Sequence, residues 1–307
     1  MAARGMTGCH RLCVLQFPSS TETEWTDAIR RRASDIGWNV HDLAVAEEWP
    51  LEPPSGSSVF FTTEIEGVEK LDPTRWIILT EDPTESAAVV GASLGVDPFV
   101  QISLVRTSIR LASSASVAAR ETDVEVLDAR AERLLLSDFG WVDRAPQTAA
   151  VAGGTARGPL DIFTTLPIPI GASADWCPTI FSYPAGPNME GGTPDIDLTG
   201  RARLLLFGPY ICLPKGLWSI DIDASIDTQT STIALMFEWG AGDRFVSHRT
   251  SVSTAGQYRI TLNRRWDVLE QAQVRIWLTL PLFQGRLTLN RCRVTRAADS
   301  TPETSAA

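Results

Sequence analysis

The segment Leu217–Asp227, LWSIDIDASID, alternates large apolar with small polar residues along its whole length. The apolar set is Trp218, Ile220, Ile222, Ala224 and Ile226, and the polar set is Ser219, Asp221, Asp223 and Ser225. Successive side chains of a β-strand point to opposite faces. The segment therefore predicts a strand with one face in a core and the other in water.

The same period of two recurs throughout the chain after Asp195. The other segments that show it, or read as strands between turn signals, are ARLLLF (202–207), STIALMFEW (231–239), DRFVSHRTSV (243–252), GQYRITLN (256–263), QVRIWLTL (273–280) and GRLTLNRCRV (285–294). Many strands with one wet face require a second sheet to cover the apolar face. We therefore expect an all-β, jelly-roll-type β-sandwich over residues 196–297, with at most one helix, at DVLEQA (267–272).

The stretch FGPYICLPKGLW, residues 207–218, explains how two of these strands are joined. Gly208 and Pro209 are expected to bulge or break the first strand, and Pro214 to Gly216 to form a turn. Tyr210 and Trp218 bracket that turn, and packing is the favoured interpretation of both.

The first 150 residues predict a different class, an α/β Rossmann-like domain. Strand-like runs such as LCVLQF (12–17) and RWIILTED (75–82) alternate with helix-like segments such as Pro18–Trp38 and Pro98–Glu121. Strands separated by helices indicate a mostly parallel sheet. Arg130–Trp141 is expected to be the last helix.

Between the two domains, residues 151–195 are rich in proline and glycine and predict a connector that packs partly on the sandwich. Residues 298–307 predict a disordered tail. A length of 307 residues agrees with two domains.

Composition limits the function. The net charge of −10 and pI near 4.9 argue against nucleic-acid binding, which requires an excess of Lys and Arg. No apolar run is long enough for membrane insertion, and the chain is expected to be cytoplasmic. The five cysteines are scattered, and the sequence predicts no cofactor and no metal site.

Residues 195–222, DIDLTGRARLLLFGPYICLPKGLWSIDI, resemble the opening of carbohydrate-binding, galactose-binding-like β-sandwich domains found beside bacterial glycosyltransferases and polysaccharide-biosynthesis proteins. The resemblance covers about a third of the chain. It implies a non-catalytic carbohydrate-recognition or accessory protein of bacterial surface-polysaccharide biosynthesis, with a glycan or a glycosyltransferase as its partner. The oligomeric state is left open.

A sugar site needs an aromatic platform and a few polar groups. Alternation places Trp277 and Arg275 on one face of QVRIWLTL, where they form the favoured ligand-binding pair. The alternative is that the connector covers this face. Trp239, Asp243 and His248 surround the turn Gly240–Asp243 and form a second candidate site, against the simpler interpretation of a solvated hairpin tip.

Two rival functions remain. A sugar-nucleotide-using enzyme would have its site at the carboxyl ends of the parallel strands, at Thr80–Asp82 or Thr62–Glu64. Against it, the segment after the first strand, PSSTETE, has no glycine to admit a phosphate. The other rival is a protein-binding scaffold. No catalytic residue is predicted.

Overall fold

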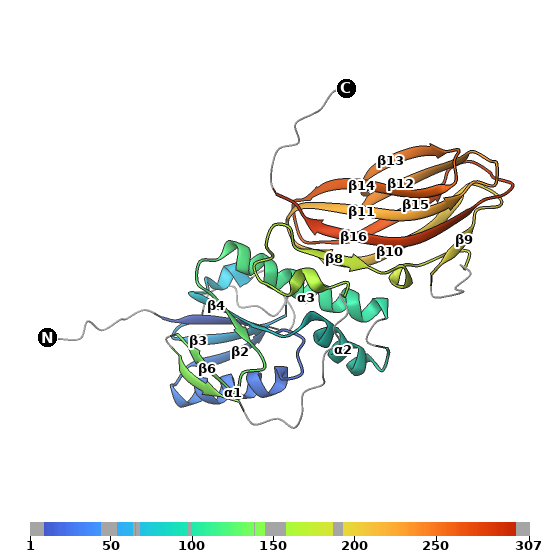
Figure 1. Ribbon diagram of the computed structural model, residues 1–307. Helices are drawn as coiled ribbons and strands as arrows, with labels where there is room; N and C mark the ends of the chain where they lie inside the picture. The colour runs from blue at the N-terminus through green and yellow to red at the C-terminus, as the bar shows by residue number, and fades with distance from the viewer. Residues whose placement is uncertain are drawn as a thin grey trace.

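The computed structural model describes residues 9–43, 54–63, 65, 68–97, 100–137, 139–144, 158–186 and 193–298. An α/β part is followed by a β-sandwich, and residues 158–186, which come between them, lie beside the sandwich (Figure 1). Within the described residues no helix is long and apolar enough to cross a membrane.

The α/β part is built on a five-stranded parallel sheet in the order β2-β3-β1-β4-β5. Its elements are β1 (Arg11–Leu15), α1 (Glu22–Asp35), β2 (Asn39–Leu43), β3 (Ser58–Thr62), a 3₁₀ helix (Val68–Leu71), β4 (Arg75–Thr80), α2 (Pro83–Leu94), α3 (Gln101–Arg120) and β5 (Val124–Asp128). The strands of this sheet are mostly buried apolar runs, as expected where helices cover a parallel sheet.

The predicted parallel sheet is present, but the Rossmann-like assignment is not supported. The described residues contain three α-helices, and the connection from β3 to β4 holds only a 3₁₀ turn. β3 lies beside β1 and β2 lies at the edge, whereas a Rossmann sheet has β2 beside β1.

The helix predicted over Arg130–Trp141 is wrong. These residues contribute to a hairpin of β6 (Arg133–Leu136) and β7 (Gly140–Asp143). Leu134 and Leu136 are buried in a cluster that includes α1, while Leu135 between them is exposed. The burial period of two is that of a strand.

The C-terminal part is a β-sandwich. One sheet has the order β10-β15-β12-β13, and the other has the order β14-β11-β16-β8, with β9 also paired to β16. The bounds are β8 (Ser173–Trp176), β9 (Asp195–Asp197), β10 (Arg203–Leu213), β11 (Gly216–Asp227), β12 (Ile233–Ala241), β13 (Arg244–Val252), β14 (Gly256–Trp266), β15 (Glu270–Leu278) and β16 (Arg286–Arg296), with 3₁₀ helices at Asp161–Phe163 and Pro178–Ile180. The faces predicted for β11 are confirmed, because its apolar set is buried. The possible helix at 267–272 is not present, because residues 267–268 form a bend and residues 270–272 begin β15.

The sandwich core holds a row of three tryptophans. The Trp239 ring lies 5.6 Å from that of Trp176 and 5.3 Å from that of Trp266. All three side chains are completely buried. Trp218 is also buried, and its indole N–H donates to the Pro214 carbonyl at 3.0 Å. Its predicted packing role is confirmed.

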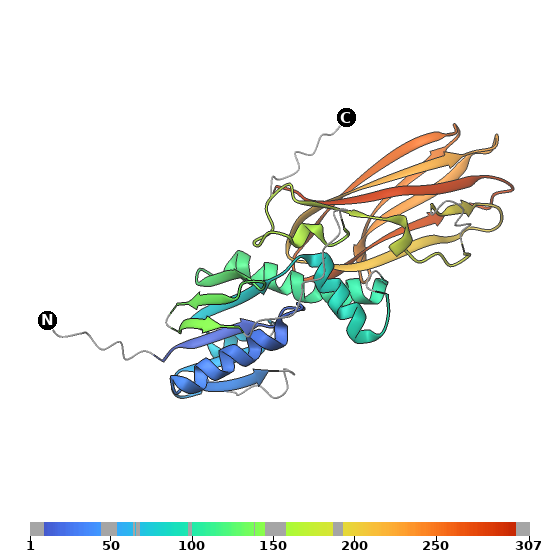
Figure 2. The same ribbon diagram turned by 60° about the horizontal axis from the view of Figure 1, so that its bottom comes forward.

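Helix α3 joins the two parts, and Figures 1 and 2 both show it between the parallel sheet and the sandwich. At the bulge in β10 predicted from Gly208 and Pro209, the Gln101 side chain donates to the Pro209 carbonyl at 3.1 Å. Ser108 Oγ accepts a hydrogen bond from the Cys212 amide at 2.8 Å. One apolar cluster contains residues of α3 and of the sandwich. The domain limits given above stay a prediction.

Candidate functional site

The inner faces of the sandwich are filled by its core, so a ligand must contact an outer face or a loop. Trp277 and Arg275 lie on the outer face of β15, between β10 and β12, and both are half-buried. Val274, Ile276 and Leu278, which alternate with them, are buried. The structure therefore brings the predicted pair onto one face.

The Trp277 ring is held in place by a carboxylate. Its indole N–H donates to Glu238 Oε2 on β12 at 2.8 Å. Glu238 is the register partner of Arg275, and Met236 is the register partner of Trp277. The indole thus has a fixed orientation, with a negative and a positive side chain beside it.

Arg275 is oriented from the neighbouring strand and turn. Its guanidinium carbon lies 3.9 Å from the centre of the Phe245 ring on β13. Its Nε donates to Gln273 Oε1 at 3.1 Å, and Nη2 donates to the Gly242 carbonyl at 3.4 Å. A row of aromatic and charged groups therefore crosses β15, β12 and β13. We call Trp277, Glu238, Arg275 and Phe245 the Trp277 surface.

The described part of the connector meets the sandwich at strand edges. Its strand β8 pairs with β16 of the opposite sheet, and Ser182 pairs with Phe207, the β10 residue opposite Arg275. Trp277 remains partly exposed beside the second contact.

The second candidate set is not brought together. Trp239 has 0% of its surface exposed and lies in the tryptophan row, so its prediction as a ligand-binding residue is corrected. Asp243 is exposed in the turn between β12 and β13. His248 is exposed on β13, opposite the buried Phe237, and so points away from the face that carries Phe245.

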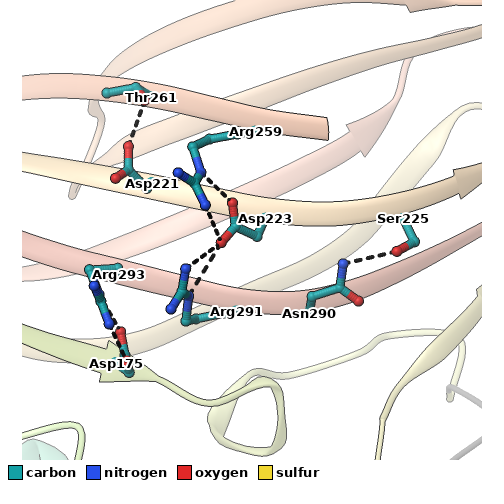
Figure 3. Close-up of polar contacts among 9 residues, drawn as sticks. All are labelled: Asp175, Asp221, Asp223, Ser225, Arg259, Thr261, Asn290, Arg291 and Arg293. Atoms are coloured by element: carbon teal, nitrogen blue, oxygen red, sulfur yellow. Dashed lines mark hydrogen bonds and ion pairs between the residues drawn. The ribbon is translucent and has the colours of Figure 1, made fainter. Parts of the chain in front are cut away.

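The outer face of the other sheet carries an array of ion pairs and polar contacts (Figure 3). Asp223 on β11 accepts from Arg259 Nε on β14 at 2.6 Å and from Arg291 Nη2 on β16 at 2.7 Å. The hydrogen bond from Arg259, helped by Arg291, lowers the pKa of Asp223 below its ordinary value. Alternation placed Asp223 outward, but it could not show which arginines pair with it.

Further contacts extend the array across the sheet. Thr261 donates to Asp221 at 2.6 Å, and Asn290 donates to Ser225 Oγ at 2.9 Å. Arg293 donates to Asp175 on β8 at 2.7 Å. Arg291 and Arg293 are two residues apart on β16 and therefore share a face, which is the sequence signal for this charged face.

Two open hollows adjoin this array. One, of about 430 Å³, is lined by Asp223, Gln257, Tyr258, Arg259 and Asn290. The other, of about 380 Å³, is lined by Asp195, Ser225, Ile226, Asp227, Gly256, Gln257, Arg286 and Thr288. Both volumes lie in the range of small-ligand sites. Sequence reasoning did not find these hollows, because they depend on strand register.

The carboxyl ends of the parallel strands carry carboxylates that are already engaged. Asp82 caps α2 by accepting from the amides of Thr84 and Glu85 at 2.9 and 3.3 Å. Glu81 accepts from the Ser20 amide at 2.8 Å, and burial raises its pKa above the ordinary value. The amides that could bind a phosphate are thus occupied by acidic side chains. Glu64 lies outside the described residues.

The described part of the chain holds no cluster of three His, Cys, Asp or Glu side chains placed to bind a metal ion. The sequence matches no family model and no curated protein.

Several solved structures of carbohydrate-binding modules are similar to this chain. TmCBM61 in complex with β-1,4-galactotriose is 9% identical over 41% of this chain and 82% of that one, with a TM-score of 0.28. Family 16 Carbohydrate Binding Module-2 is 6% identical over 34% of this chain and 76% of that one, with a TM-score of 0.26. The Glycosylation Associate Protein (Gap123) complex from Streptococcus agalactiae is 8% identical over 84% of this chain and 49% of that one, with a TM-score of 0.29. Likenesses at this level do not decide function, so we argue from the geometry of this chain.

Proposed function

We propose that this protein recognises carbohydrate, without catalysis, through the Trp277 surface. The observation that carries the proposal is the partly exposed indole on an outer sheet face, fixed by its hydrogen bond to Glu238. An aromatic ring packs against the C–H face of a pyranose, and polar neighbours contact its hydroxyl groups. Arg275 and Glu238 supply a donor and an acceptor beside the ring.

Pre-orientation of the ring supports this function. A side chain that is already held in one rotamer loses little conformational freedom on binding, which favours affinity. The Glu238 carboxylate and the Phe245 ring hold Trp277 and Arg275 respectively. A role as an accessory protein of bacterial surface-polysaccharide biosynthesis is the finer form of the proposal, and rests on the sequence resemblance.

The test is retention on immobilised polysaccharides by affinity electrophoresis. Trp277→Ala should weaken retention strongly and leave the melting temperature nearly unchanged, because a partly exposed ring contributes less to folding than a core ring. Trp277→Phe keeps a smaller platform and should retain part of the binding. Trp141→Ala removes a tryptophan that is 51% exposed in the β6–β7 hairpin, and should leave retention intact.

Equal retention of wild type and of both Trp277 variants would refute the Trp277 surface as a sugar site. Equal loss in the Trp141 variant would show that retention depends on exposed indoles in general rather than on this face.

A further inference from the structure

The two hollows on the sheet opposite the Trp277 surface adjoin each other, and we call them together the groove. Gln257 on β14 lines both, and Ser225 on β11 lines the second while bonding to Asn290, which lines the first. The groove therefore runs along β11 over the five residues from Asp223 to Asp227, or about 13 Å. Figure 3 shows the part of its floor from Asp223 to Ser225 and Asn290.

The groove floor is held rigidly by cross-strand pairs. Asp223 is bonded to Arg259, and Asp195 Oδ2 accepts from Arg286 Nε at 2.8 Å. Side chains fixed in this way present their remaining donors and acceptors in set positions, which lowers the entropy lost on binding. In both pairs an arginine donor lies beside a carboxylate acceptor.

One acceptor at the second hollow has no partner. Asp195 Oδ1 is buried and makes no hydrogen bond within the described part of the chain. A buried carboxylate oxygen without a donor is unfavourable. The Asp195 side chain is 32% exposed and lines the hollow, so a turn of its carboxyl group would present this oxygen to a hydroxyl or ammonium group of a ligand there.

The arginines at the groove are already paired with carboxylates, which disfavours an anionic ligand. Arg259 and Arg291 both donate to Asp223, and Arg286 donates to Asp195. The remaining polar lining consists of hydroxyl and amide groups, at Ser225, Gln257, Tyr258, Thr288 and Asn290. Such a surface matches a chain of hydroxyl groups with neutral or positive charge.

The backbone of the groove floor excludes a peptide that binds by strand addition. β11 pairs with β14 on one side and with β16 on the other, so its amides and carbonyls are used. Strand addition requires an exposed edge. A ligand here can use side chains alone, as a sugar does.

We propose that this groove is a second glycan-binding site, which takes a neutral or amino-bearing oligosaccharide and rejects uronic acids. It does not depend on the Trp277 surface, since the two lie on opposite sheets. With both sites filled, one protein molecule would hold two glycan chains, because a single short chain cannot span both faces.

The test uses full-length protein carrying Trp277→Ala, so that the Trp277 surface does not contribute to the binding that is measured. Binding of cellohexaose, xylohexaose, chitosan hexamer and oligogalacturonate is measured by isothermal titration calorimetry. We expect binding of at least one neutral or amino-bearing oligosaccharide and none of oligogalacturonate. Asp195→Asn exchanges the unpartnered oxygen for a donor and should weaken binding about tenfold, the loss expected for one hydrogen bond to a charged group.

Gln257→Ala is the second variant, since Gln257 is exposed on β14, lines both hollows and can be truncated without disturbing the core. It should also weaken binding. Asp143→Asn, which makes the same charge change in the β6–β7 hairpin, is the matched control and should bind normally.

Three outcomes would overturn the second site. Loss of all binding in Trp277→Ala would assign glycan recognition to the Trp277 surface alone. Normal binding by both groove variants, or tight binding of oligogalacturonate, would contradict the groove directly. Normal retention by Trp277→Ala, lost on adding Asp195→Asn, would instead refute the proposed function of the Trp277 surface and keep the groove.

Discussion

Replacing Ser108 by alanine tests whether the α/β part and the sandwich unfold together. Ser108 Oγ accepts from the Cys212 amide of β10 at 2.8 Å and donates to the Val105 carbonyl at 2.7 Å. Both Ser108 and Cys212 are buried. Ser108→Ala leaves the Cys212 amide without a partner, which costs about 1–3 kcal/mol. The better helix propensity of alanine returns at most about 0.7 kcal/mol, so we expect a net loss of about 1–2 kcal/mol.

Ser113→Ala is the matched control. Ser113 is also largely buried on α3, but its hydroxyl donates only to the Ile109 carbonyl within the same helix. Alanine leaves no donor without a partner there. The free energy of unfolding should change by less than about 0.5 kcal/mol.

Thiol labelling with peptide mass spectrometry measures the unfolding of the α/β part and of the sandwich separately. Cys13 lies in β1 of the parallel sheet, and Cys292 lies in β16 of the sandwich. Both are buried, and burial raises the pKa of each thiol, so neither forms the reactive thiolate while the protein is folded. Burial likewise raises the pKa of Cys212, to about 12.

In Ser108→Ala we expect labelling of both Cys13 and Cys292 to rise by the same factor, about 5–30 for 1–2 kcal/mol. An increase at Cys292 with none at Cys13 would refute cooperative unfolding of the two parts. No increase at either would show that the Ser108 hydrogen bond contributes nothing to stability.

Three further variants test other features. Trp239→Ala should cost about 3–5 kcal/mol in denaturant unfolding, because it removes the middle ring of the tryptophan row; a cost below 1 kcal/mol would contradict its core role. Glu81→Gln should stabilise the protein at pH 7, since the raised pKa of Glu81 means that the folded state disfavours the ionised carboxyl, and the gain should disappear in acid as the wild-type carboxyl is protonated; a gain that grows on acidification would contradict the sign. Gly240→Ala should lower the melting temperature, because a Cβ there would lie 2.2 Å from the Arg244 carbonyl oxygen; an unchanged temperature would show that β13 moves aside freely.

The sandwich could be predicted well from the sequence, because strands with one buried and one solvent-exposed face show a clear period of two. In β11 the period of two separates Trp218 from Asp221 without ambiguity, and the burial of the strand follows it. In β6 the three consecutive leucines, Leu134 to Leu136, conceal the same period, because Leu135 is apolar and yet exposed. Leucine also has high helix propensity, which explains the mistaken helix.

The candidate site was predicted in part for the same reason. The alternation of side chains along β15 is sufficient to place Trp277 and Arg275 on the outer face. The alternation of side chains along β12 also places Trp239 on the same face as Phe237, and hence in the core. This alternation predicted the burial of Trp239 better than its position beside a turn did. The groove could not be predicted from the alternation of side chains, since its arginine–aspartate pairs depend on which residues of neighbouring strands lie opposite each other.

The way the α/β part joins the sandwich bears on both proposed sites. Helix α3 contacts the sandwich at β10, an edge strand, where the bulge receives Gln101. Had the helix packed across the outer face of either sheet, it would have covered the Trp277 surface or the groove. Trp277 instead stays partly exposed, and the Arg259 side chain is 60% exposed. Because both faces keep exposed side chains with α3 attached, the coupling of the two parts through Ser108 and the accessibility of both faces are compatible, and a variant that loosens α3 should alter stability without altering either site's chemistry.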